Sequence, residues 1–348
     1  MKRMSLIMIV FIALAAIFLP GMKETAPAGN KPGFGANDHT KNQKGGMALV
    51  GDHAIRDAAG RTVCTKEPFS RIISLYSAHT ENLFSLGLSD EIIGVSRIDA
   101  ELEPAAGKKT FSARNSPERF LAEKPDLVIV RPMLDYGYPR LMKQLERFGI
   151  QVVSLQPGDI DEMMTYWHIL GRLAGREDDA QNMVARFQKG VAEARSVKAD
   201  ITQKKTVYFE AIHNRFKTFS PGSMPLFALA CAGGKNAAQD ARPSRGTNIA
   251  DFGKEQILAR GREIDVYLAQ EGHMNRPSVA GIKNTPGFSV IRAVREGEVY
   301  LVDEAIVSRP TLRLLEGIST IGGILYPNHF TEETRKWIEK HADTQQRQ

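Results

Sequence analysis

The chain has 348 residues, of which 42% are apolar and 25% charged, and it carries a formal net charge of +6. This length allows two domains of ordinary size, each with its own core, and this composition excludes a fibre or a largely disordered chain. The basic residues are dispersed rather than gathered in one run, so we expect no nucleic-acid partner.

The first 28 residues have the pattern of a signal peptide. Lys2 and Arg3 precede an unbroken apolar run of 14 residues, residues 6–19. A membrane span needs roughly 20 residues, so this run suits the core of a signal peptide better. Residues 26–28, Ala-Pro-Ala, offer a cleavage site. We therefore expect export to the periplasm, with an uncleaved membrane anchor as the alternative.

Residues 29–46, rich in Gly, Asn and Lys, are typical of a flexible tether. Strands and helices then alternate over an N-terminal lobe, residues 47–158. In chain order the pattern predicts a hairpin around 58–60, strands over 71–75, 91–95, 126–130 and 151–155, and helices over 80–86, 117–124 and 139–148. Such alternation favours a parallel sheet with helices on both faces.

Residues 159–200 contain no strand pattern and instead predict two connecting helices. The first covers residues 161–174, Gly175 interrupts the pattern, and the second covers residues 177–199. At 1.5 Å per residue the second helix is roughly 35 Å long. We expect it to be a rigid connector between two halves of the protein.

The α/β pattern resumes over a C-terminal lobe, residues 201–342. It predicts strands over 206–210, 263–268 and 297–302, and helices over 224–232, from 254 to 259, from 309 to 325 and over 332–341. The predicted fold is therefore α/β: two Rossmann-like lobes with central parallel sheets, joined by one long rigid α-helix. Cys64 and Cys231 are far apart in the sequence, and we expect two unpaired, mostly buried thiols.

The two lobes share a local sequence pattern. Glu118 begins a Glu-Arg-Phe-Leu-Ala segment before the strand at 126, and Glu255 begins a Glu-Gln-Ile-Leu-Ala segment before the strand at 263. The offset is eight residues in both cases, since 126 − 118 = 8 and 263 − 255 = 8. A Glu in the first helical turn is also favoured by the helix dipole alone. The repetition nevertheless predicts two similar lobes with one exposed carboxylate at an equivalent corner of each.

Several segments, in this order, resemble the periplasmic binding proteins for iron–siderophore, cobalamin and haem uptake. They are residues 57–63 (DAAGRTV), 71–75, 80–88, 116–119 (SPER), 124–129 (KPDLVI), 293–300 (AVREGEVY) and 309–310 (RP). The resemblance implies a ligand held between two lobes and a permease dimer of an ABC importer in the inner membrane as partner. It also implies an acidic residue on each lobe that pairs with arginines of the permease, and these positions match Glu118 and Glu255.

Ligands of such folds lie outside the carboxyl ends of the strands, so the loops there supply the candidate ligand-binding residues. These are Tyr76, Arg114, Arg131, Tyr136, His213, Arg215, Arg245 and Arg309. Arginine pairs with carboxylates and stacks on planar rings, and tyrosine offers a flat apolar face with a polar tip. Such a set is typical of a site for an anionic metal chelate.

We expect an iron(III)-siderophore as the ligand, with cobalamin or another corrinoid, or haem, as alternatives. Direct ligation of iron by His79, His213 or Tyr76 is a further possibility. A bare zinc or manganese site is disfavoured, because no group of histidines has ligand spacing. We expect a monomer without a cofactor.

No catalytic signature is present, whether a nucleophile elbow, a phosphate loop or a dinucleotide fingerprint. We therefore expect a binding protein and no enzyme. A chelatase-like enzyme with two lobes is the alternative of a different class, and it would need a catalytic His–Glu pair deep between the lobes.

Overall fold

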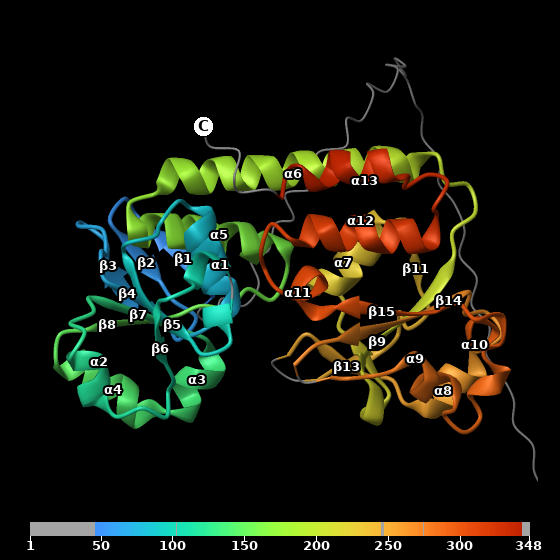
Figure 1. Ribbon diagram of the computed structural model, residues 1–348, viewed down its shortest axis with the longest axis horizontal. Coiled ribbons are helices and arrows are strands. Elements are labelled where there is room, and N and C mark those ends of the chain that lie inside the picture. Colours follow the sequence, from blue (N-terminus) through green and yellow to red (C-terminus); the bar gives the residue numbers. More distant parts are fainter. Residues whose placement is uncertain (1–45, 102, 245–246, 274, 343–348) are drawn as a thin grey trace, which may run out of the picture. The chain divides into compact units, whose positions relative to one another are not determined.

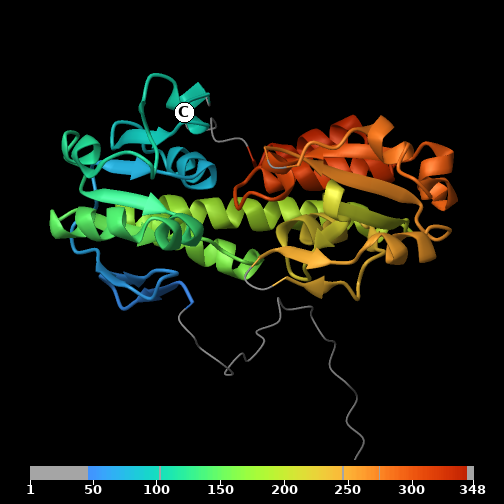
Figure 2. The same ribbon diagram turned by 90° about the horizontal axis from the view of Figure 1, so that it is seen from below.

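The computed structural model describes residues 46–101, 103–244, 247–273 and 275–342. The predicted signal peptide and all but the last residue of the predicted tether lie outside the described residues, and so does Arg245. Figures 1 and 2 show one sheet formed by the first half of the chain and a second sheet formed by the second half.

The sheet of the N-terminal lobe is parallel throughout, as predicted, with the strand order β6-β5-β4-β7-β8. Its strands are β4 (Ile72–Ser74), β5 (Ile92–Ser96), β6 (Lys109–Phe111), β7 (Leu127–Val130) and β8 (Gln151–Ser154). The helices of this lobe are α1 (Ser77–Ser85), α2 (Pro117–Leu121), α3 (Pro132–Gly137) and α4 (Pro139–Arg147), with short 3-10 turns η1 (Asp99–Glu101) and η2 (Glu103–Ala105).

A small antiparallel sheet precedes the parallel sheet along the chain and contains the predicted hairpin. It consists of β1 (Ala48–Val50), β2 (Ala54–Arg56) and β3 (Thr62–Cys64). Both cysteines of the chain are free, but the prediction that both are buried is wrong for Cys64, which lies exposed on β3. An outer strand of a small sheet has no second layer to cover its outward-facing side chains.

The two connecting helices have the predicted bounds almost to the residue: α5 is Ile160–Ala174 and α6 is Glu177–Ala199. Asp159 caps α5 by accepting a hydrogen bond from the backbone N–H of Glu162, and Gly175 ends it in the left-handed conformation. Helix α6 packs on α5 and also on α7, α12 and α13 of the second half of the chain (Figure 1).

Two glycines allow these close helix contacts. A Cβ at Gly171 of α5 would lie 2.6 Å from the Cβ of Ala180 on α6, and a Cβ at Gly190 of α6 would lie 2.7 Å from Cδ1 of Leu315. Helix α6 is therefore held tightly at one part by the N-terminal half and at another part by the C-terminal half, as expected for a rigid connector.

The C-terminal lobe has a mixed sheet with the order β12-β13-β10-β9-β14-β15, and β11 also pairs with β9. Its strands are β9 (Thr206–Ile212), β10 (Lys217–Phe219), β11 (Lys235–Asn236), β12 (Arg242–Pro243), β13 (Ile249–Asp251), β14 (Val266–Glu271) and β15 (Val299–Asp303). Its helices are α7 (Met224–Cys231), α8 (Lys254–Ala259), α9 (Val279–Lys283), α10 (Arg292–Glu296), α11 (Glu304–Val307), α12 (Leu314–Leu325) and α13 (Glu332–Glu339), with η3 (His213–Arg215) and η4 (Phe288–Val290).

The antiparallel strands of this sheet differ from the purely parallel prediction. Strands β9, β14 and β15 are parallel, but β10 runs antiparallel to β9, and β13 runs antiparallel to β10. Only η3 and Phe216 separate β9 from β10, and Phe216 adopts a left-handed conformation with φ 50°. So short a connection can only reverse the chain, because a parallel neighbour needs a long crossover.

Each sheet packs one face on a core that the two lobes share. Alternate strand residues divide between two faces: Leu127 and Ile129 of β7 join the shared core, whereas Val128 and Val130 pack in a separate cluster of the N-terminal lobe. In the C-terminal lobe, Val207 and Phe209 of β9 belong to the same shared core. The largest core is therefore continuous across both lobes, and the lobes are not independent hydrophobic units.

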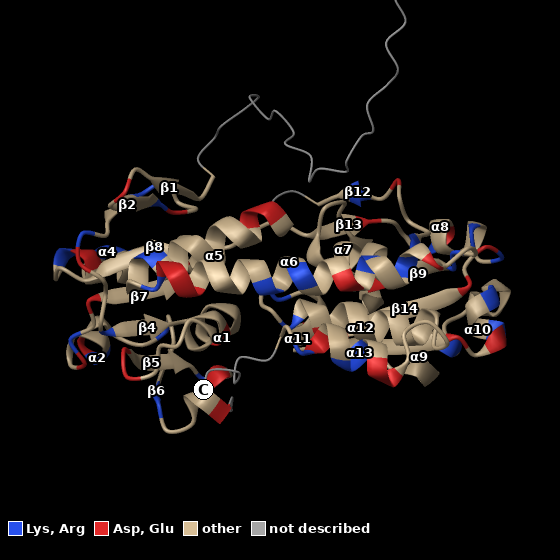
Figure 3. Ribbon diagram, turned by 90° about the horizontal axis from the view of Figure 1, so that it is seen from above, with Lys and Arg blue, Asp and Glu red and all other residues tan. Residues whose placement is uncertain are grey.

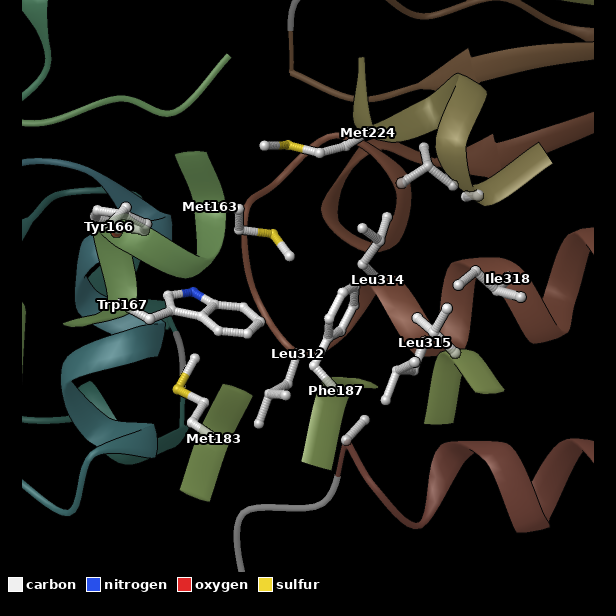
Figure 4. Close-up of a cluster of buried hydrophobic side chains, with 14 of the residues drawn as sticks. Met163, Tyr166, Trp167, Met183, Phe187, Met224, Leu312, Leu314, Leu315 and Ile318 are labelled. Atoms are coloured by element: carbon white, nitrogen blue, oxygen red, sulfur yellow. The ribbon is translucent and has the colours of Figure 1, made fainter. Parts of the chain in front are cut away.

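Figure 4 shows the middle of this shared core, where side chains from α5, α6, α7 and α12 meet. Trp167 is fully buried and lies edge-on to Phe187, with ring centroids 5.5 Å apart. Fully burying one such aromatic side chain stabilises the folded state by roughly 2–3 kcal/mol.

Three predicted boundaries are wrong for identifiable reasons. Helix α1 begins at Ser77, so Thr80 is no cap; its buried hydroxyl bonds to Ser74 and Asp99 instead. Strand β14 begins at Val266 and not at residue 263, since residues 261–263 form a turn. Helix α12 begins at Leu314, and Arg309 and Pro310 before it form a bend that contacts the other lobe.

The predicted repetition between lobes is present, but its spacing differs. Asp126 before β7 accepts hydrogen bonds from the backbone N–H groups of Ser70 and Arg71, and Asp265 before β14 accepts one from Thr206. Both aspartates thus hold the start of the neighbouring strand, β4 or β9. Counted to these residues, the offsets are 126 − 118 = 8 and 265 − 255 = 10, so the second lobe has two additional residues. The equivalence therefore rests on a shared role and not on identical spacing.

Candidate functional site

The first group of candidate residues lies at the carboxyl end of β4 and β7. Tyr76 follows β4 and precedes α1, and Arg131 follows β7 and precedes α3. Because β4 and β7 are adjacent and parallel, the two residues meet, and the guanidinium carbon of Arg131 lies 4.4 Å from the centroid of the Tyr76 ring. Burial raises the pKa of Tyr76, while the charge of Arg131 opposes that rise. The pair is a flat, cationic surface suited to stacking on a planar anionic ligand.

His79 is fully buried beside the Tyr76–Arg131 pair and is unsuited to bind a ligand. Its side chain has no exposed surface, with Nε2 3.2 Å from the carbonyl oxygen of Val130 and Nδ1 2.7 Å from Oη of Tyr166. The carbonyl only accepts, so Nε2 donates to it and Nδ1 accepts from the tyrosine hydroxyl. Burial lowers the pKa of His79 to about 3. Both nitrogens are therefore occupied, and the predicted possibility of direct iron ligation by His79 is wrong.

Arg309 lies where the two lobes touch. Its Nη1 is 2.5 Å from Oε1 of Glu81 on α1, while Oε2 of Glu81 is buried and has no hydrogen-bond partner among the described residues. The arginine charge also acts on the nearby Tyr76 hydroxyl and opposes the rise in its pKa. Arg309 therefore belongs with the Tyr76–Arg131 pair in space, but Glu81 already balances much of its charge.

The residue after Arg309 joins the lobes directly. The carbonyl oxygen of Pro310 accepts hydrogen bonds from Nδ2 of Asn82 at 2.9 Å and from Nε1 of Trp167 at 3.1 Å. Both donors are buried residues of the N-terminal half. Two donors on one buried carbonyl fix the point at which the C-terminal lobe meets α1 and α5.

The second group lies on β9, on the adjacent strand β14 and in the turn η3 that follows β9. Nδ1 of His213 lies 3.0 Å and 3.1 Å from the two carboxylate oxygens of Glu210, a residue with no exposed surface. Tyr267 of β14 donates its hydroxyl to the same carboxylate. The hydrogen bond with Glu210 raises the pKa of His213. In contrast to His79, His213 keeps part of its ring exposed, with 24% of the side-chain surface accessible.

Sequence reasoning found His213 but missed the residues that hold it. Glu210 interrupts an otherwise apolar strand, Thr-Val-Tyr-Phe-Glu-Ala-Ile, and a carboxylate at such a position is a usable signal of a functional pair. Nothing in the local sequence marks Tyr267, which pairs opposite Tyr208 and reaches Glu210 only through the sheet register.

Three further predicted residues are exposed at the surface: Arg114, Tyr136 and Arg215. Nε of Arg114 lies 3.4 Å from the hydroxyl of Tyr138, and Tyr136 is 71% exposed on α3. Two large apolar side chains that the sequence did not single out are also exposed near the carboxyl edge of the N-terminal sheet: Met133 on α3 and Ile98 after β5. This edge therefore presents apolar surface beside its arginines.

The two predicted docking acids are both exposed in the first turn of a helix, Glu118 in α2 and Glu255 in α8. Each helix leads into a central strand, β7 or β14, and so begins near the carboxyl edge of its sheet. The backbone N–H of Glu118 and the Ser116 hydroxyl lower the pKa of the Glu118 carboxyl. Both predicted docking acids therefore lie toward the edges of the sheets that carry the predicted ligand-binding residues.

Figure 3 shows acidic and basic residues interspersed along the elements of both lobes, in agreement with the dispersed charge of the sequence. Within the described ranges, no three His, Cys, Asp or Glu side chains converge as they would on a metal ion. No helix of the described part of the chain is both long and apolar enough to cross a membrane.

Comparison with known families matches residues 72–306 to the periplasmic binding protein family. An uncharacterized ABC transporter substrate-binding lipoprotein, YvrC, from Bacillus subtilis is 26% identical over 92% of this chain and 97% of its own length. A vitamin B12-binding protein from Vibrio campbellii is 26% identical over 73% of this chain and 88% of its own.

A solved structure is also similar. It is described as a possible iron-binding (periplasmic solute-binding) protein from Staphylococcus epidermidis. It has a TM-score of 0.66 and 28% identity, and the match covers 75% of this chain and all of that one.

Proposed function

Because the chain belongs to the periplasmic binding protein family and has the role of an ABC transporter substrate-binding protein, we propose that it captures a bulky metal chelate between its lobes. It then delivers this chelate to a membrane permease. The candidate chelates are an iron(III)-siderophore, a corrinoid such as cobalamin, and haem. The names of the relatives, one a vitamin B12-binding protein and one possibly iron-binding, support this class of ligand.

The observation that carries the proposal is the placement of Tyr76, Arg131 and Arg309. The first two come from the N-terminal lobe and the third from the C-terminal lobe, and their charges and rings act on one another. A ligand bound there contacts both lobes at once. A transport protein needs such contacts if ligand binding is to change the surface that the permease contacts.

Delivery depends on the exposed acids. Glu118 and Glu255 are proposed to pair with arginines on the two halves of a permease dimer in the inner membrane, one lobe on each half. Charged pairs at the rim of an interface mainly steer the encounter and fix its register. A monomer that is exported by its predicted signal peptide and works in the periplasm suits this role. The proposal includes no catalytic step.

The test is a titration of the purified chain with an iron(III)-siderophore, aquocobalamin and iron(III) protoporphyrin IX, followed by absorbance and calorimetry. We expect one class to bind, and Arg131→Ala to weaken that binding by about 10–100-fold, the usual effect of losing a charged hydrogen-bond partner. Arg262→Ala is the matched control, because Arg262 is exposed in the turn at the opposite edge of the C-terminal sheet. The proposal fails if none of the three binds.

A further inference from the structure

Helix α4 carries a row of three basic residues on its outer face. Arg140, Lys143 and Arg147 are exposed, and spacings of three and four residues place them on the same side of the helix. The opposite side packs on the core of the N-terminal lobe through Leu141, Met142 and Leu145. Because the apolar side is held in the core, the helix presents these three cations, the α4 basic row, outward.

The surrounding structure does not neutralise the α4 basic row. Glu146, the one acid of the helix, pairs with Arg61 at 3.2 Å. No side chain of the row forms an ion pair or a hydrogen bond with another residue of the described ranges. Arg140 also lies in the first turn, where the helix dipole disfavours a cation, and like charges at these spacings repel one another. The row therefore makes α4 less stable by itself, and an external anionic partner offsets this repulsion.

The α4 basic row lies on the same side of the lobe as the proposed docking acid. Helix α2, which carries Glu118 in its first turn, packs on α4. In Figure 1 both helices lie on the side of the N-terminal lobe that faces away from α6, and α8, which carries Glu255, lies on the corresponding side of the C-terminal lobe. Docking of the two acids on a membrane permease, as proposed, therefore brings α4 toward the surrounding membrane.

We infer that the α4 basic row binds anionic lipid headgroups of the inner membrane beside the permease. The inference rests on the docking orientation in the proposed function and adds a second partner to it. At 1.5 Å per residue the row is about 10 Å long, and it lies on the convex surface of a helix. Headgroup phosphates form a dense, laterally mobile array of negative charge, so all three cations find partners there without a fixed geometry.

One apolar side chain extends this surface. Phe148 follows α4 directly and is 64% exposed. Phenylalanine beside basic residues is typical of protein surfaces that lie on a membrane. The other apolar residues of α4 are buried in the lobe, so the helix does not insert into the bilayer. The contact is therefore mainly electrostatic and takes place at the level of the headgroups.

The expected strength suits a transient contact. Each Lys or Arg held near an anionic membrane strengthens binding by about fivefold, so the row contributes about 100-fold. Salt screens this attraction beyond about 8 Å under physiological conditions. The row therefore acts only when the lobe is close to the membrane, and it holds the lobe near the permease while Glu118 meets its partner.

The experiment uses the protein purified from the periplasm of cells that export the full chain. Co-sedimentation is measured with vesicles of phosphatidylcholine alone and of phosphatidylcholine mixed equally with phosphatidylglycerol. We expect binding to the anionic vesicles only, with release in high salt. Arg140→Gln with Lys143→Gln and Arg147→Gln should weaken this binding by about 100-fold. An uncleaved apolar N-terminal segment would bind both kinds of vesicle and so cannot produce the difference between them.

The matched control removes the same number of charges elsewhere. Lys66→Gln with Lys189→Gln and Lys204→Gln changes three exposed cations outside α4, and it should weaken binding by no more than about twofold. An equal loss in both triple variants would show that only the net charge matters, and it overturns the inference. Circular dichroism and the melting temperature of each variant show whether it is folded.

A conservative variant tests the kind of partner. Arg140→Lys with Arg147→Lys keeps the charges but removes the planar guanidinium groups, and it should bind anionic vesicles as the wild type does. Headgroups respond mainly to charge, whereas fixed carboxylates of a protein partner distinguish arginine from lysine. A loss of vesicle binding in this variant contradicts the inference.

Further outcomes separate this inference from the proposed function. A wild type that binds a chelate but neither kind of vesicle overturns the lipid contact and leaves the transport proposal standing. Slower chelate uptake by cells with the triple α4 variant, without any vesicle binding by the wild type, assigns the row to the permease and also overturns the inference. Vesicle binding without binding of any chelate overturns the transport proposal and leaves the lipid contact.

Discussion

The two lobes each place a histidine after the equivalent strand of their sheets, in opposite surroundings. In the N-terminal lobe β4 leads to His79, which is fully buried and has a pKa lowered to about 3 by burial. In the C-terminal lobe β9 leads to His213, which is partly exposed and has a pKa raised by Glu210. The N-terminal lobe buries its histidine in the core, whereas the C-terminal lobe leaves its histidine partly accessible. Similar topology therefore does not imply similar chemistry.

The largest expected effect tests whether the lobes are equivalent in docking. Reversing both exposed acids, Glu118→Lys with Glu255→Lys, should abolish chelate uptake by cells that carry the permease, while chelate affinity of the purified protein stays unchanged. Each single reversal should give an intermediate rate, because one lobe still docks. Asp161→Lys with Glu296→Lys is the control, since it changes the net charge equally at other exposed positions. Unchanged uptake in the double variant would refute the docking roles.

The next largest effect concerns the different pKa values of the two histidines, His79 and His213. Histidine in the unfolded chain has a pKa near 6.5. Below this pH the unfolded chain therefore binds a proton that the buried His79 of the folded protein does not bind. Its folded pKa is depressed, and stability must therefore fall on acidification. The loss approaches about 5 kcal/mol as the pH drops from 6.5 toward 3.

Urea unfolding of the wild type and His79→Gln across this pH range measures that loss, and the variant should lack this part of the slope. His213 has the opposite sign: its raised pKa contributes stability that is fully present below about pH 6.5 and lost as the pH rises through its folded value. Parallel slopes in the wild type and His79→Gln would show that His79 titrates normally.

A third effect tests whether the lobes unfold together. Trp167→Ala removes a fully buried ring from the shared core and a donor to the Pro310 carbonyl, and it should lower the free energy of unfolding by about 3–5 kcal/mol. Trp167→Phe keeps most of the packing and leaves Asn82 on that carbonyl, so it should cost about 1 kcal/mol. Because the core is continuous, calorimetry should show one transition in each case. Two separate transitions in the wild type would mean that the lobes fold independently.

The smallest effect tests the repeated aspartates. Asp126→Asn and Asp265→Asn each remove the charge from a carboxylate that holds the start of a neighbouring strand, β4 or β9. Each should lower the free energy of unfolding by about 1 kcal/mol, with Asp90→Asn at an exposed position as the control. A large effect in one lobe and none in the other would argue against the equivalence of these positions.

Much of the fold was readable from local patterns. Helix α6 was predicted with its observed bounds, and so was α8, because periodicity, acids in the first turn and flanking glycines are all local signals. Predictions failed where distant contacts override local preference. The bend at Arg309 and Pro310 is one case, since the Pro310 carbonyl accepts hydrogen bonds from the other lobe. The hairpin of β9 and β10 is another, because it depends on a left-handed Phe216.

The candidate site divides in the same way. The sequence pointed to Tyr76, Arg131 and His213, because residues after predicted strands gather at one edge of a parallel sheet. It did not distinguish the two histidines, His79 and His213, whose roles depend on burial and on partners far along the chain. Arg309 pairs with Glu81, 228 residues away, and His213 shares Glu210 with Tyr267.

By itself, the sequence determined the order and type of the main elements and the family resemblance. Periodicity and capping act over a few residues, so one sequence is enough to reveal them. Only the tertiary structure decided which polar groups are sealed in the core and which remain free, because this depends on residues brought together by strand pairing and helix packing. Free energies of burial and charge pairing act across space and leave no local pattern in the chain.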